Sequence, residues 1–85
     1  MEKVIAEEVT KLANTVLAAQ LRSANDLRTG GASGIGLDME PCTQGMEKQV
    51  AFLLNAKLEE LCGAKSYQVD QTRISDRFLW VDRLD

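Results

Sequence analysis

Residues 5–27 read IAEEVTKLANTVLAAQLRSANDL, and their apolar side chains recur in alternating steps of four and three. These apolar positions are Ile5, Val9, Leu12, Val16, Ala19 and, after the polar Ser23, Leu27. Steps of three and four place side chains on one side of an α-helix, where they can contact another helix. We therefore predict an amphipathic helix over about residues 3–28 that packs against a second helix.

A second helix is predicted over about residues 44–62, because its apolar residues also return with helical spacing. Its apolar side consists of Met46, Val50, Leu53, Leu54, Leu58 and Leu61. Phe52 lies off this side, towards the flank of the helix. An aromatic side chain in that position indicates that the helix is covered from more than one direction.

The C-terminal segment, about residues 66–84, fits two structures. Tyr67 and Val69 alternate with polar residues, and residues 78–81 read FLWV, which is typical of strands. Ile74, Phe78 and Val81 instead share a helical spacing. We favour a β-hairpin over a third short helix, and we expect the bulky residues near the C-terminus to pack on a second copy of the chain.

Residues 29–36 read TGGASGIG and resemble the TGxxxGxG cofactor-binding turn of the short-chain dehydrogenase/reductase family. The resemblance implies that Thr29, Gly30, Gly31, Gly34 and Gly36 approach the pyrophosphate of a dinucleotide at a helix N-terminus. The surrounding residues argue against this function, because the motif requires a buried strand before it and a helix directly after it.

The flanking sequence meets neither requirement. Residues 21–28 continue a helical pattern, and Pro41 blocks a helix running on from the motif. The family's Tyr-x-x-x-Lys pair is also absent, since Asp70 and Gln71 follow the only tyrosine, Tyr67, where the lysine is needed. We therefore predict no cofactor and assign about residues 29–43 to a glycine-rich loop between the two helices.

The composition of the chain bounds its function. Its 85 residues fit one domain, 1–85, with a thin core. The net charge of −3 and the even spread of Lys and Arg argue against general binding to nucleic acid or to a membrane surface. No signal peptide or membrane span is evident, and two cysteines are too few for a disulfide framework, so we expect a cytoplasmic protein with reduced thiols.

Catalytic chemistry has little support in the sequence. The chain contains no histidine, which removes the commonest general base and the commonest metal ligand. Cys42 and Cys62 cannot supply the four thiolates of a cysteine-only zinc site. The adjacent carboxylates Glu7–Glu8 and Glu59–Glu60 are typical of a solvated helix surface. We therefore predict neither catalytic nor metal-binding residues and expect that the protein is not an enzyme.

The predicted fold is mainly α: an antiparallel two-helix hairpin with a small C-terminal β-hairpin or third helix, completed as a helical bundle by dimerisation. The predicted function is a non-catalytic protein-interaction or self-assembly module that forms a homodimer or binds a partner protein of unknown identity. The predicted interface residues are Ile5, Val9, Leu12, Val16, Phe78 and Trp80. The alternative is a protein that binds a small ligand, an anion or a nucleotide at the glycine-rich loop 29–36.

Overall fold

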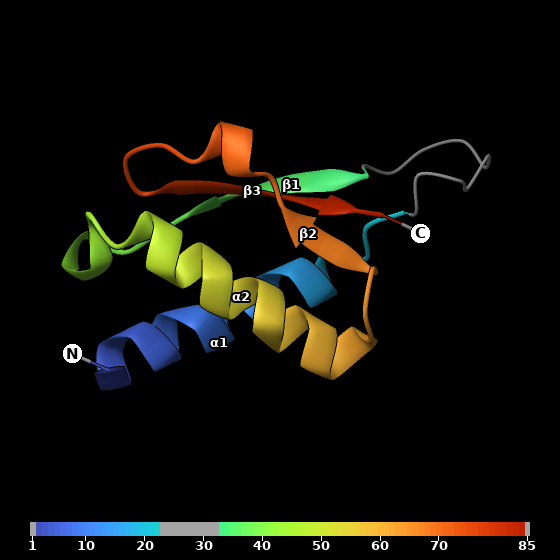
Figure 1. Ribbon diagram of the computed structural model, residues 1–85, viewed down its shortest axis with the longest axis horizontal. Coiled ribbons are helices and arrows are strands. Elements are labelled where there is room, and N and C mark those ends of the chain that lie inside the picture. The colour runs from blue at the N-terminus through green and yellow to red at the C-terminus, as the bar shows by residue number, and fades with distance from the viewer. Residues whose placement is uncertain (1, 23–32, 85) are drawn as a thin grey trace.

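The computed structural model describes residues 2–22 and 33–84 and contains two helices and a three-stranded sheet (Figure 1). The helices are α1 (Glu2–Ala18) and α2 (Glu47–Cys62). The strands are β1 (Gly34–Asp38), β2 (Tyr67–Val69) and β3 (Phe78–Arg83). Two short 3₁₀ turns, η1 (Pro41–Thr43) and η2 (Gln71–Arg73), lie in the connections. Both helices lie on one side of the sheet, and η2 lies on the other (Figure 1).

The prediction of a mainly α helical bundle with a small C-terminal appendage is wrong, because the fold is α+β. The sheet is antiparallel in the order β1-β3-β2, so β3 is central and pairs with a strand from the middle of the chain. That strand, β1, lies within residues 29–43, which were predicted to form a loop. The two alternatives for the C-terminal segment are also resolved: residues 67–69 and 78–83 are strands.

The glycines of β1 concealed a two-residue period in its sequence. Ile35 and Leu37 pair with Val81 and Leu79 of β3, and all four share the sheet face towards the helices. Gly34 and Gly36 alternate with them and therefore lie on the opposite face. Glycine has a low strand propensity, so the segment resembles a loop until its pairing with β3 is known.

The first helix is shorter than predicted. It ends at Ala18, and Gln20 adopts a left-handed backbone with φ of 51°, which stops the helical hydrogen-bonding pattern. Leu21 is nevertheless buried, so the chain returns an apolar side chain to the core after this turn. Residues 23–28 of the predicted helix lie outside the described residues, as do Thr29, Gly30 and Gly31.

The core lies between the two helices and the inner face of the sheet. Ala19 of the predicted apolar stripe lies beyond the end of α1 and is exposed, and Leu27 lies outside the described residues. The core takes Ile5, Val9, Leu12 and Val16 from α1; Val50, Ala51, Leu54 and Leu58 from α2; and Leu37, Val69, Leu79 and Val81 from the sheet. All of these side chains are nearly inaccessible to water within one copy of the chain. Neither helix in the described segments is long and apolar enough to cross a membrane.

Candidate interaction surface

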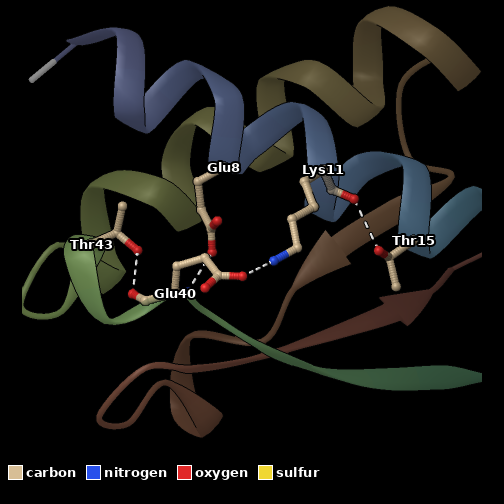
Figure 2. Close-up of polar contacts among 5 residues, drawn as sticks. All are labelled: Glu8, Lys11, Thr15, Glu40 and Thr43. Carbon is tan, nitrogen blue, oxygen red and sulfur yellow. Dashed lines mark hydrogen bonds and ion pairs between the residues drawn. The ribbon is translucent and has the colours of Figure 1, made fainter.

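A polar cluster ties α1 to the connection that follows β1 (Figure 2). Glu8 is only 4% exposed, and its Oε1 accepts a 2.9 Å hydrogen bond from the backbone N–H of Glu40. Lys11, one turn further along α1, pairs with the side chain of Glu40. Thr43 Oγ1 donates to the carbonyl of Glu40, and Thr15 Oγ1 donates to the carbonyl of Lys11. The cluster therefore fixes the turn at η1 against α1.

The electrostatics of this cluster favour a structural role over acid–base catalysis. The hydrogen bond between Lys11 and Glu40 raises the pKa of Lys11 and lowers the pKa of Glu40, and their mutual attraction adds to both effects. Each shift stabilises the form already charged at neutral pH, whereas a general acid or base needs a pKa near the working pH. Both side chains are about half exposed, at 52% and 51%, as in an ordinary surface ion pair.

The outer face of the sheet, turned away from the helices, holds two aromatic side chains over the glycines of β1. A Cβ atom on Gly34 would lie 2.8 Å from the indole of Trp80, and one on Gly36 would lie 2.8 Å from the ring of Phe78. The indole N–H donates a 2.8 Å hydrogen bond to Asp82 Oδ1, and the Arg73 guanidinium lies 4.9 Å from the indole centroid. This arrangement packs both rings onto the sheet itself.

These contacts give Gly34 and Gly36 a structural role that the resemblance to a cofactor-binding turn does not imply. Both are strand residues, and their missing side chains allow the aromatic rings to lie close to the backbone. The turn of the dehydrogenase family instead places its glycines between a strand and a helix. Here Leu37, the residue after Gly36, continues the strand and is buried on its inner face.

The side of α2 opposite the core carries the most exposed large apolar side chain of the described residues. Phe52 is 72% exposed, and it projects about 160° around the helix from the fully buried Leu54. Ala56 follows Phe52 by one turn, and Lys48, Gln49 and Glu59 surround them. We call Lys48, Gln49, Phe52, Ala56 and Glu59 the α2 outer face.

An open groove continues this surface towards α1. One hollow of about 300 Å³ is lined by Ala6, Val9, Thr10, Leu53, Ala56, Lys57 and Glu60. A second, also about 300 Å³, shares Ala6 and Leu53 with the first. Leu53 lines both hollows and is 36% exposed, and Ala56 lines the first, whereas Phe52 lies beside them on α2 and lines neither hollow.

A larger hollow lies along α1 but does not form a ligand site from the residues described. Its volume is about 780 Å³, and its described lining residues all belong to α1. One side of a single helix is convex and cannot surround a small molecule, whereas ligand sites are concave and bury most of the ligand. We therefore do not assign a binding function to this hollow.

The predicted interface residues occupy two different places. Ile5, Val9, Leu12 and Val16 are at most 6% exposed and pack into the core of their own chain. Phe78 and Trp80 are half-buried on the outer face of the sheet, against the glycines of β1. Phe52 is not among the predicted interface residues, although its position off the apolar stripe was the signal that could have identified it.

Comparisons with protein-family models, curated proteins and solved structures found no match to this chain. Within residues 2–22 and 33–84, no three Cys, Asp or Glu side chains come together in a way that could hold a metal ion. The candidate site therefore rests on the chain's own geometry, and the exposed Phe52 on α2 is its clearest feature.

Proposed function

We propose that this protein is a non-catalytic protein-interaction module and that the α2 outer face is its contact surface. The single observation that carries the proposal is the 72% exposure of Phe52 in the middle of a helix whose opposite side is fully buried. Aromatic side chains are enriched at protein interfaces relative to the rest of the protein surface. A partner that covers Phe52 would remove a large apolar surface from water, which is the main driving force for association.

The reducing cytoplasm is the proposed location of this module. Cys42 and Cys62 are both free thiols, which supports a compartment that keeps cysteines reduced. Ligand binding at residues 29–36 stays a prediction, since Thr29, Gly30 and Gly31 lie outside the described residues. No observation on Gly34 or Gly36 favours it over their contact with the aromatic rings.

Site-specific photocrosslinking tests the proposed function. A photoreactive benzophenone amino acid at position 52 should form covalent adducts with protein in cells that express the full chain. The matched control carries the same amino acid at Gln71, an exposed position in η2 that faces away from α2. Adducts at position 52 but not at 71 are the expected result. Equal labelling at both positions, or no adduct at either, would overturn the proposal.

A further inference from the structure

We infer that the partner of the α2 outer face is a second copy of this chain, with the two α2 helices packed antiparallel about a twofold axis. This inference rests on the proposed function and specifies the partner. It follows from the order of the side chains along α2, because a twofold axis between antiparallel helices opposes residues that lie about equally far from the axis along the helix. With the axis at the level of position 54, the pairs Phe52–Ala56, Lys48–Glu59 and Gln49–Glu60 each meet this condition to within one residue.

The centre of the surface pairs a large side chain with a small one. If the twofold axis crosses the helix pair at the level of position 54, Phe52 of one helix opposes Ala56 of the other. The same contact recurs on the other side of the axis. Both residues are exposed in one copy. Large residues opposite small ones allow two helices to interdigitate without voids.

The charges are complementary under the same symmetry. Lys48 and Glu59 project at nearly the same angle around α2, within about 20° of each other, at opposite ends of the outer face. A twofold axis between antiparallel helices brings the same flank of each helix together. Lys48 of one copy therefore opposes Glu59 of the other, twice in each dimer, while Gln49 opposes Glu60 on the other flank.

Neither charge is used within the single chain. Lys11 forms an ion pair with Glu40 and Arg73 forms one with Asp70, and neither pair involves Lys48 or Glu59. The side chains of Lys48 and Glu59 are exposed and have no hydrogen-bond or ion-pair partner in the described part of the chain. A parallel pair of α2 helices would place Lys48 against Lys48 and Glu59 against Glu59, so the charge pattern selects the antiparallel arrangement.

The surface is small, so we expect weak association with a dissociation constant in about the micromolar range. The solution mass of the full chain should therefore rise from that of a monomer to that of a dimer between about 1 µM and about 1 mM. Analytical ultracentrifugation across this range measures the dissociation constant of the wild-type chain.

Charge reversal distinguishes this dimer from any other. Lys48→Glu and Glu59→Lys should each weaken self-association about tenfold or more, because each places like charges in two contacts. The double variant Lys48→Glu/Glu59→Lys should recover the wild-type constant. An equimolar mixture of the two single variants should form a heterodimer, since every opposed pair is then of opposite sign.

Matched controls carry the same charge changes away from the α2 outer face. Lys3→Glu and Glu7→Lys alter exposed residues of α1 and should leave the dissociation constant within about twofold of wild type. Circular dichroism spectra of all variants should match the wild type, because every altered side chain is exposed.

Two outcomes would overturn the inference. The first is a wild-type chain that stays monomeric throughout the concentration range. The second is a dimer whose constant does not respond to the charge reversals or does not recover in the double variant. Adducts of position 52 with a different protein, combined with either outcome, would leave the proposed function standing. Absence of any adduct at position 52 would remove both.

Discussion

At the scale of single residues, the glycines of β1 show how one short sequence can serve two different structures. The letters TGGASGIG match a cofactor-binding turn, yet Gly34 and Gly36 lie within a strand beneath Trp80 and Phe78. The indole of Trp80 cannot easily move away, because it is hydrogen-bonded to Asp82 and lies against Arg73. The size of the residue at position 34 is therefore constrained by a side chain from the other end of the sequence.

Gly34→Ala should destabilise the protein by about 1–3 kcal/mol, because the new methyl group would overlap the indole of Trp80. The free energy of unfolding in urea measures the loss. Gln68→Ala, on an exposed strand position, is the control and should change stability by less than about 0.5 kcal/mol. In a Trp80→Leu background the cost of Gly34→Ala should fall to less than half; an unchanged cost would show that the overlap is not with the indole.

At the scale of elements, single carboxylates join segments that are distant in sequence. Glu8 and Glu40 connect α1 to the turn after β1, and Glu47 connects the start of α2 to the chain just before β3. Glu47 Oε2 accepts hydrogen bonds from the backbone N–H groups of Gly45 and Arg77, at 2.8 and 3.1 Å. Both donors have positive φ angles, so the carboxylate holds two unusual backbone conformations in place.

This arrangement predicts a pH dependence of stability. The backbone hydrogen bonds from Gly45 and Arg77 lower the pKa of Glu47 from its ordinary value of 4.5. A lowered pKa in the folded state means that Glu47 contributes stability above about pH 4.5, which is lost as the pH falls through the folded-state pKa. Glu47→Gln should therefore be less stable than wild type at pH 7, and the difference should narrow towards about pH 3.

The measurement is the urea midpoint of each protein at both pH values. Glu7→Gln is the control, since the side chain of Glu7 is exposed and makes no hydrogen bond or ion pair within the described segments. It should follow the wild-type pH dependence. A constant difference between wild type and Glu47→Gln from neutral to acid pH would contradict the assignment of this contribution to the ionised carboxylate.

At the scale of the whole molecule, both helices lie on one face of the sheet, and α2 carries the exposed Phe52 on the side away from the core. An 85-residue chain buries a smaller share of its surface than a larger domain, so its stability is a small remainder of opposing terms. Covering Phe52 in a dimer would add apolar burial that a single copy does not reach.

Dimerisation predicts a melting temperature that depends on protein concentration. Above the dissociation constant, each tenfold increase should stabilise a chain by about 0.7 kcal/mol, which corresponds to roughly 3–5 °C for a domain of this size. Phe52→Glu should remove the dependence while leaving the melting temperature at low concentration close to wild type. Differential scanning calorimetry measures the melting temperature of both proteins across the concentration range. Melting temperatures that rise equally with concentration in the two proteins would contradict a role for Phe52 in assembly.

Both helices and most of the core could be located from the sequence, because helical periodicity is a local property. The four or five residues around each position suffice to place a side chain inward or outward. The sequence also marked Phe52 as lying off the buried stripe. The sheet depended on pairing between β1 and β3, whose paired residues are 40 to 48 positions apart, and no local pattern encodes such a pairing. Only the tertiary structure decided that Gly34 and Gly36 form a strand and that Phe52 is uncovered, since both facts depend on what distant segments place beside these residues.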